Sequence, residues 1–267
     1  MSNLALRLLT AVVGLPLVAA LVLWQQPAGF EALVLLVAGL ALTEYAAITL
    51  PSTPRPMRAG LVLLGVGLSA SLYLAPDLAV VWLLAAFLAT ATLVLFEPGE
   101  IPGAGARLGA AVLGVFYLGM LTAPLAILKR DAPHGPAWVL LAVAVTFGND
   151  TGAYFAGRAF GRHKLYPAVS PAKTVEGGLG GLVAGLAIML GARATIAPWL
   201  TLGDCLLVGL PAGVVGPVGD LLESLIKRSA GVKDSGRLLP GHGGMLDRID
   251  ALLFVSAWIY VYVLHLR

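Results

Sequence analysis

Charged residues are scarce in this chain, and cysteine is almost absent. Only 12% of the 267 residues are Asp, Glu, Lys or Arg, whereas a soluble domain carries about 25%. The hydrophobic content of 59% and the mean hydropathy of +0.92 therefore predict an all-α polytopic membrane protein. The single cysteine, Cys205, excludes an intrachain disulfide, a CxxC metal site and an iron–sulfur cluster. Basic loops of a membrane protein account for the net charge of +3, so we expect no nucleic-acid partner.

Nine apolar segments approach or exceed the roughly 20 residues that a helix needs to cross a bilayer. They cover residues 4–24, 28–50, 59–75, 78–96, 108–128, 137–157, 177–197, 202–226 and 245–266. The first is longer than a signal-peptide core and is expected to be a spanning helix. We expect one membrane domain over 1–267, with helices of low specificity in 1–135 and the catalytic helices and loops in 136–267.

Positive charge is distributed unevenly about these spans. With nine spans, 13 of the 17 Lys and Arg residues fall on the side that carries the N-terminus. Because basic residues gather in cytoplasmic loops, we expect the N-terminus and the two long basic loops, 158–176 and 227–244, in the cytoplasm. The expected location is the cell inner membrane, with the active site facing the cytoplasm.

Carboxylates enter the apolar segments at a similar depth on this side. Asp150 follows 13 residues of the sixth span, and Asp220 follows 15 residues counted from Cys205. Both stretches correspond to roughly 20 Å of helix, which is short of a full crossing. Asp247 and Asp250 open the ninth span from the same side. Ionisable groups in a membrane are costly and mark functional sites, so we expect a polar cavity open to the cytoplasm.

The acidic residues also share helix faces. One face, spaced i, i+3, i+4 and i+7, holds Asp220, Glu223, Ser224 and Lys227. Another, spaced i and i+3, holds Asp247 and Asp250. Carboxylates this close repel each other unless a cation lies between them. A set of oxygen ligands without His or Cys favours Mg²⁺ over zinc, with a second metal or a monovalent cation left open.

Cations and a glycine-rich turn surround these candidate metal ligands. Arg binds phosphate through a bidentate fork and Lys as a point charge, and the basic residues here are Lys227, Arg228, Lys233, Arg237 and Arg248. The backbone approaches a phosphate most closely at glycine, directly before a helix N-terminus, and the glycines here are Gly241, Gly243 and Gly244. This combination suggests phosphoryl or nucleotidyl transfer, which depends on positioning and charge neutralisation.

A second polar block, FGNDTGAYFAGRAFGRHKLYPAVSPAKTVEGG, joins the sixth and seventh spans. It contains Asp150, Ser170, Lys173 and Glu176, and the run SPAKTVEGG is typical of a loop that folds over a polyanion. The glycines between Gly177 and Gly185 recur at intervals of about four, which favours close helix packing.

The two blocks together resemble the phosphatidate cytidylyltransferase family, also called CDP-diacylglycerol synthases. The residues that carry the resemblance are Ser224, Lys227, Arg228, Lys233, Asp234, His242, Gly243, Gly244, Asp247, Arg248 and Asp250, each at the family spacing. SPAKTVEGG is similar to the family's Ser-Pro-x-Lys-Thr-x-Glu-Gly motif. The resemblance covers residues 145–267, and the first half of the chain matches only as a set of apolar helices.

The resemblance implies that CTP and phosphatidic acid from the bilayer give CDP-diacylglycerol and pyrophosphate with Mg²⁺, in a largely helical homodimer. It also implies that Asp220 and Asp247 are metal ligands. We further expect Glu223 or Asp250 to assist the metal, and Lys227, Arg228, Lys233 and Arg248 to bind phosphate oxygens. The substrate-binding candidates are Asp150, Ser170, Lys173, Glu176, Ser224, Asp234, His242, Gly243 and Gly244.

Other interpretations of these residues stay open. Asp220 and Asp247 also suit structural salt bridges with Lys227 and Arg248, and His242 suits a turn residue better than a metal ligand or base. Some polar residues fit membrane anchoring better than catalysis, namely Glu44 with Tyr45, Tyr154 and Tyr166.

Two rival functions remain. One is a related enzyme for another lipid, such as a polyprenol kinase or an isoprenoid-ether cytidylyltransferase. The other is a transporter, although its site is expected near the bilayer midplane rather than at one end.

Overall fold

The computed structural model describes residues 12, 14, 16–97, 99–236, 238 and 243–267. Within them, eight helices are long and apolar enough to cross a membrane, which confirms the all-α polytopic class and a multi-pass membrane protein. Each of the last eight predicted spans corresponds to one of these helices, with limits that differ by a few residues. The first predicted span, 4–24, lies largely outside the described residues.

The chain divides into two compact units. Unit 1 comprises Met1–Ile127 with Ser229–Arg248, and unit 2 comprises Leu128–Arg228 with Ile249–Arg267. The segment 229–248, which carries half of the family motif, thus groups with the N-terminal helices rather than with the helices on either side of it in the sequence.

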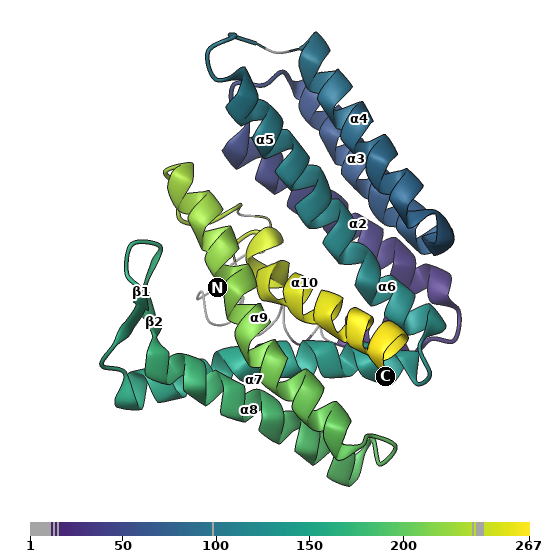
Figure 1. Ribbon diagram of the computed structural model, residues 1–267, viewed down its shortest axis with the longest axis vertical. Coiled ribbons are helices and arrows are strands. Elements are labelled where there is room, and N and C mark those ends of the chain that lie inside the picture. Colours follow the sequence, from purple (N-terminus) through teal and green to yellow (C-terminus); the bar gives the residue numbers. More distant parts are fainter. Residues whose placement is uncertain (1–11, 13, 15, 98, 237, 239–242) are drawn as a thin grey trace. The chain divides into compact units, whose positions relative to one another are not determined.

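The helices of unit 1 follow one another through short joins (Figure 1), and three of them have a proline in the first turn, at Pro27, Pro56 and Pro76. They are α2 (Pro27–Thr49), α3 (Arg55–Leu74), η1 (Pro76–Leu78), α4 (Ala79–Phe96), α5 (Ala104–Gly114), the π-helical turn η2 (Val115–Met120) and α6 (Leu121–Asp131), whose last residues belong to unit 2. Proline suits these positions because it lacks an N–H that the first turn of a helix leaves unbonded anyway.

Small residues bring these helices together. A Cβ atom on Gly119 would lie 2.6 Å from the carbonyl oxygen of Gly65, so η2 and α3 pack backbone to backbone there. Tyr45 is only 2% exposed and donates a hydrogen bond to the carbonyl of Ala110, 2.8 Å away. The interpretation of Tyr45 as an interfacial anchor is therefore wrong, because its ring fills a helix–helix contact.

Unit 2 contains α7 (Gly135–Phe160), β1 (Lys164–Tyr166), β2 (Ser170–Thr174), α8 (Val175–Thr195), α9 (Leu202–Ser229) and, after its first turn, α10 (Leu246–Val261), which ends in the π-helical turn η3 (Tyr262–Leu266). The antiparallel hairpin of β1 and β2 was not predicted; it projects from the ends of α7 and α8 (Figure 1). The expected loop between the two spans is thus an ordered ribbon.

Glycines allow α7, α8 and α9 to approach closely, as predicted. A Cβ atom on Gly180 would overlap that of Ala156, and one on Gly213 would lie 2.6 Å from the Cα of Leu182. At the other end of α9, Asp204 is 1% exposed and accepts a hydrogen bond from the hydroxyl of Tyr262, 2.7 Å away. These contacts fix α9, which carries Asp220, against both of its neighbours.

Candidate active site

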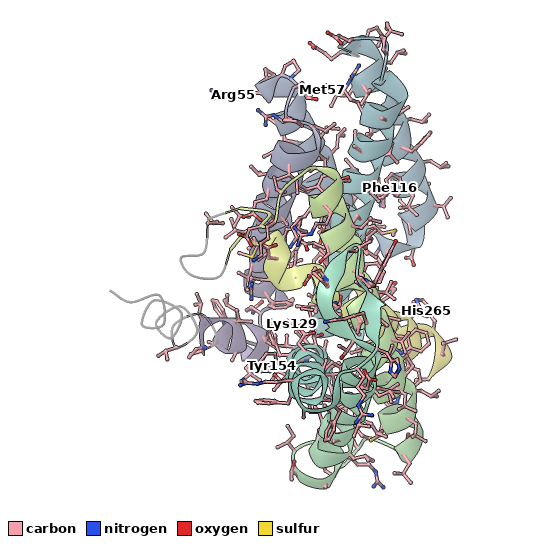
Figure 2. The ribbon with its side chains drawn as sticks, turned by 90° about the vertical axis from the view of Figure 1, so that its left-hand side faces the viewer. Arg55, Met57, Phe116, Lys129, Tyr154 and His265 are labelled. Atoms are coloured by element: carbon pink, nitrogen blue, oxygen red, sulfur yellow. The ribbon has the colours of Figure 1, made fainter. Side chains whose placement is uncertain are left out.

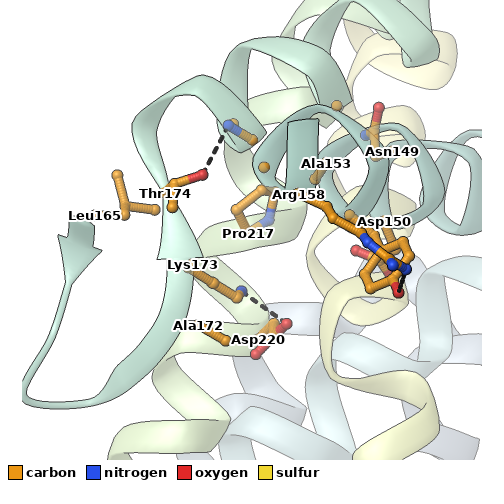
Figure 3. Close-up of a pocket in the computed structure, with 15 residues that line it drawn as sticks. Asn149, Asp150, Ala153, Arg158, Leu165, Ala172, Lys173, Thr174, Pro217 and Asp220 are labelled. Carbon is orange, nitrogen blue, oxygen red and sulfur yellow. Dashed lines mark hydrogen bonds and ion pairs between the residues drawn. The ribbon is translucent and has the colours of Figure 1, made fainter. Parts of the chain in front are cut away.

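A cavity of about 400 Å³ opens in unit 2 between α7, β2, α8 and α9 (Figure 3). Its charged residues are Asp150, Arg158, Lys173 and Asp220, and the amide of Asn149 lies among them. The predicted neighbours Asp150 and Asp220 thus line one cavity from two helices. Lys173 joins them from the unpredicted hairpin.

Glycine shapes the wall of this cavity. Gly177 lies so close to α7 that a Cβ atom there would be 2.9 Å from the carbonyl oxygen of Ala153. Gly178 lies beside it, and a Cβ atom there would meet nothing within 4 Å. The start of α8 is therefore packed tightly on one side and open to the cavity on the other, which larger residues would prevent.

Two neighbouring side chains contact the carboxylate of Asp220. Lys173 Nζ lies 2.7 Å from Asp220 Oδ2, and Ser224 Oγ donates to Asp220 Oδ1 across 3.3 Å. The side chains of Lys173 and Asp220 are 23% and 30% exposed, so the pair remains accessible from the cavity. Three sequence-predicted residues, Lys173, Asp220 and Ser224, therefore form one cluster.

A second ion pair is buried one turn further along α9. Glu223 Oε2 lies 2.6 Å from Lys227 Nζ, and Glu223 is only 1% exposed. Both residues were expected to contact ligands, Glu223 as a helper of the metal and Lys227 on phosphate. In the structure each neutralises the other, because a buried charge needs a partner.

Asp250, in the second turn of α10, brings a third carboxylate into unit 2. It interacts electrostatically with Asp220 and Asp150, and also with Lys227. A Cβ atom on Gly219 would lie 2.6 Å from the carbonyl oxygen of Asp250, so α9 and α10 touch directly beside Asp220. Carboxylates from α7, α9 and α10 are thus gathered within electrostatic reach, as their predicted depths implied.

Two other predicted residues hold the hairpin in place. The Glu176 carboxylate accepts hydrogen bonds from the backbone amides of Arg162 and His163 and lies 2.6 Å from His163 Nδ1. Arg228 Nε donates to the carbonyl of Val169 across 3.4 Å. Both contacts attach the ribbon that carries Lys173 and the partly exposed Ser170 to the helices.

The side-chain amide of Asn149 is buried at this cavity. It is 3% exposed, and neither polar atom of its side chain has a hydrogen-bond partner among the described residues. Buried amides are almost always bonded, so this one is available to water or to a ligand. Asn149 had no predicted role, although a polar residue in the middle of an apolar span is a signal for one.

In unit 1, Asp247 organises the segment that precedes α10. Its Oδ2 accepts hydrogen bonds from the amide of Gly244 (2.8 Å), the amide of Ser235 (3.1 Å) and the hydroxyl of Ser235 (3.0 Å). Gly243 has a φ of +79°, a backbone conformation that favours glycine. The predicted glycine turn is therefore closed onto the predicted metal ligand.

Glu44 on α2 holds the same segment from the other side. Its Oε1 accepts from the amide of Met245, and its Oε2 accepts from the amide of Leu246 and shares the Ser235 hydroxyl with Asp247, each donor lying 2.9 Å from Glu44. The interpretation of Glu44 as an interfacial anchor is therefore wrong. The signal was a carboxylate within an apolar span, but its donors lie about 200 residues away along the chain.

The remaining predicted residues of unit 1 are solvent-facing or outside the described residues. Lys233, Asp234 and Arg248 are exposed, and we assign them no contact. His242 and Arg237 lie outside the described residues. Asp220 and Asp247 belong to different units, so their joint role as metal ligands stays a prediction from the sequence.

Curated relatives were found by sequence comparison. The chain is 41% identical over 158 residues to "Phosphatidate cytidylyltransferase" of Bacillus subtilis (strain 168), which covers 58% of this chain and 57% of the relative. It is 42% identical over 157 residues to the protein of that name from Brucella suis biovar 1 (strain 1330), with the same coverage. The chain spans a little over half the length of these relatives.

A Staphylococcus saprophyticus protein with the same name is 46% identical over 132 residues, which cover 48% of this chain and 49% of the relative. The sequence profile of the Cytidylyltransferase family covers much more, because it matches residues 5–266. It therefore includes the apolar helices of the first half as well as both polar blocks. The chain belongs to the cytidylyltransferase family.

Proposed function

We propose that this protein transfers the cytidylyl group of CTP to phosphatidic acid, with release of pyrophosphate, in phospholipid biosynthesis. The observation that carries the proposal is the cavity of unit 2, where Lys173, Asp220 and Asp150 meet on residues of the family motifs. The names of the relatives support the same reaction.

The reaction is a substitution at phosphorus. A phosphate oxygen of phosphatidic acid forms a bond to the α-phosphorus of CTP, the bond between the α-phosphorus and the bridging oxygen to the β-phosphate breaks, and pyrophosphate leaves with that electron pair. A phosphate monoester is already anionic at neutral pH, so the attacking oxygen needs no strong base. The protein therefore has to position two polyanions and offset their repulsion.

The residues fit Mg²⁺. Among the described residues no group of three His, Cys, Asp or Glu side chains is arranged to hold a metal. Mg²⁺ does not require such a cage, because it usually keeps several waters and binds through one or two carboxylates plus substrate phosphates. We propose Asp220 and Asp247 as those carboxylates, with Asp250 as an additional oxygen donor. When bound, the ion supplies charge neutralisation for the triphosphate and the leaving pyrophosphate.

The cations have separate tasks in this proposal. Lys173 lies at the cavity and exchanges its contact with Asp220 for a phosphate oxygen when CTP binds. Arg228, Lys233 and Arg248 bind further phosphate oxygens through charge-assisted hydrogen bonds. Lys227 is paired with Glu223 within α9, so we assign Glu223 to orienting Lys227 rather than to the metal.

The location follows from the same chemistry. CTP is cytosolic and phosphatidic acid lies in the bilayer, so we propose an active site that faces the cytoplasm and is open to lipid. The excess of Lys and Arg on one side supports this orientation in the cell inner membrane, with the N-terminus in the cytoplasm. A homodimer, which the family resemblance implies, is part of the proposal.

The test is pyrophosphate release by purified protein in detergent with CTP, phosphatidic acid and Mg²⁺. Release is expected to need both substrates and to fall by at least about 10²-fold in Asp220→Asn and Asp247→Asn, the size of effect seen when a charge-stabilising group is removed. Asp131→Asn is the matched control, because this exposed carboxylate pairs only with its neighbour Arg130 among the described residues. No turnover by folded wild-type protein with any nucleoside triphosphate would overturn the proposal.

A further inference from the structure

A second cavity, of about 480 Å³, lies in unit 1 between α2 and α3. Two helical stripes face each other across it. The α2 stripe, spaced i, i+3 and i+4, consists of Thr43, Ala46 and Ala47. The α3 stripe, spaced i, i+3, i+4 and i+7, consists of Arg55, Arg58, Ala59 and Val62, and Leu63 lies beside it.

Side-chain size explains why this space stays open. Alanines occupy the facing positions on both helices, whereas the larger Met57 and Leu61 of α3 are turned away and buried, with exposures of 4% and 3%. Leu63, at the rim, is 72% exposed, which is normal for a residue that faces lipid. The cavity is therefore a largely apolar groove with an exposed leucine at its rim.

The groove carries positive charge at one end. Arg55 is the first residue of the apolar helix α3 (Figure 2), and Arg58 follows one turn later. Neither guanidinium has an ion pair or hydrogen bond within the part of the chain that the structure describes. Their spacing of i, i+3 puts both on the same helix face. Two unneutralised guanidinium groups over an apolar groove match an anionic headgroup with its acyl chains.

The two positive charges favour a phosphate monoester over a phosphodiester as the headgroup. A phosphate monoester carries roughly −1.5 to −2 at neutral pH, which two guanidinium groups offset, whereas the phosphodiester of an ordinary anionic lipid carries one charge. Thr43 of the groove directly precedes Glu44, which holds the segment containing Asp247. Successive residues lie on different faces of a helix, so the groove and this segment share one turn of α2 but not one face.

We infer that this groove is the docking site for phosphatidic acid, with its phosphate on Arg55 and Arg58 and an acyl chain along Val62 and Leu63. The inference rests on the proposed function, since phosphatidic acid is the acceptor in that reaction.

The first measurement is photolabelling in nanodiscs of phosphatidylcholine with a photoactivatable phosphatidic acid. Peptides from residues 43–63 are expected to carry label in the wild type and to lose it roughly tenfold in Arg55→Gln/Arg58→Gln, the loss expected when charge-assisted contacts are removed. Arg55→Lys/Arg58→Lys is expected to keep part of the label. The matched control is Arg107→Gln, because Arg107 contacts the carbonyl of Glu100 rather than a cavity.

The second measurement is kinetic. In mixed micelles the Gln double variant is expected to raise the KM for phosphatidic acid roughly tenfold and to leave the KM for CTP within about twofold. Unchanged labelling in the Gln double variant, or equal rises in both KM values, would overturn the inference. It would also be overturned if phosphatidylglycerol competed with the photoactivatable lipid as well as unlabelled phosphatidic acid does. Arginine-dependent labelling in a wild-type protein without turnover would support the lipid site and overturn the proposed function, so the two failures are distinguishable.

Discussion

Lys173 Nζ lies 2.7 Å from Asp220 Oδ2, so a residue of the cytidylyltransferase motif in the hairpin neutralises a candidate metal ligand in α9. The pair is partly exposed and lines the cavity. Lys173 thus neutralises a carboxylate that is proposed to bind a divalent cation. It also lies within reach of the phosphates that would accompany that cation.

Lys173→Gln is therefore expected to lower turnover by about 10²-fold, because a positioned cation at a phosphoryl centre is lost. The melting temperature should change little, since a partly exposed pair contributes little to stability. Lys164→Gln on strand β1 is the matched control, because Lys164 is exposed on the same hairpin. A Lys173→Gln enzyme as fast as the control would show that this lysine does not serve the reaction.

Glu44→Gln is expected to release the segment before α10. Glutamine keeps the shape of Glu44 but loses the charge that accepts three hydrogen bonds. A loss of about 2 kcal/mol in local stability corresponds to roughly 30-fold faster hydrogen exchange at the amides of Met245 and Leu246. Exchange measured by mass spectrometry in detergent checks this, with Glu97→Gln, an exposed residue, as the control. Unchanged protection of these two amides would refute the role assigned to Glu44.

Two glycines of α8 should respond in opposite directions to alanine. A Cβ atom on Gly180 would overlap that of Ala156 and lie 3.0 Å from the carbonyl oxygen of Gly152, so Gly180→Ala should destabilise unit 2 by about 1–3 kcal/mol. A Cβ atom on Gly191 would meet nothing within 4 Å, so Gly191→Ala should stabilise the helix by up to about 1 kcal/mol. The melting temperatures of the two variants in detergent test this prediction. Equal shifts in melting temperature would contradict the packing described.

Asp204→Asn should affect stability rather than catalysis. Asp204 is 1% exposed and accepts hydrogen bonds from Tyr262 and Thr201, and it pairs with Arg267. Loss of the Asp204 charge should lower the free energy of unfolding by about 3 kcal/mol, because Arg267 is left without its partner. Turnover measured well below the melting temperature should stay within about twofold of wild type. Tyr262→Phe removes one hydrogen bond, so its melting temperature should lie between those of the wild type and Asp204→Asn.

Sequence patterns predicted the membrane class, eight of the helices and the meeting of Asp150 with Asp220, because long apolar runs and helical rise are local properties. They did not predict the β1–β2 hairpin, whose strands have only three and five residues and no alternating pattern. They also missed the partners of Glu44 and the pairing of Glu223 with Lys227. Which of several nearby opposite charges a side chain meets depends on tertiary packing, which local spacing does not encode.

The contact between Glu44 and the start of α10 has a consequence for how the chain is made. Its donors lie 191 to 202 residues downstream, so they do not exist when α2 enters the membrane. At about 5–20 residues per second, translation leaves this carboxylate without them for on the order of 10–40 s. Water or lipid headgroups have to solvate it in the meantime, and a chain released before residue 235 acquires none of these three contacts.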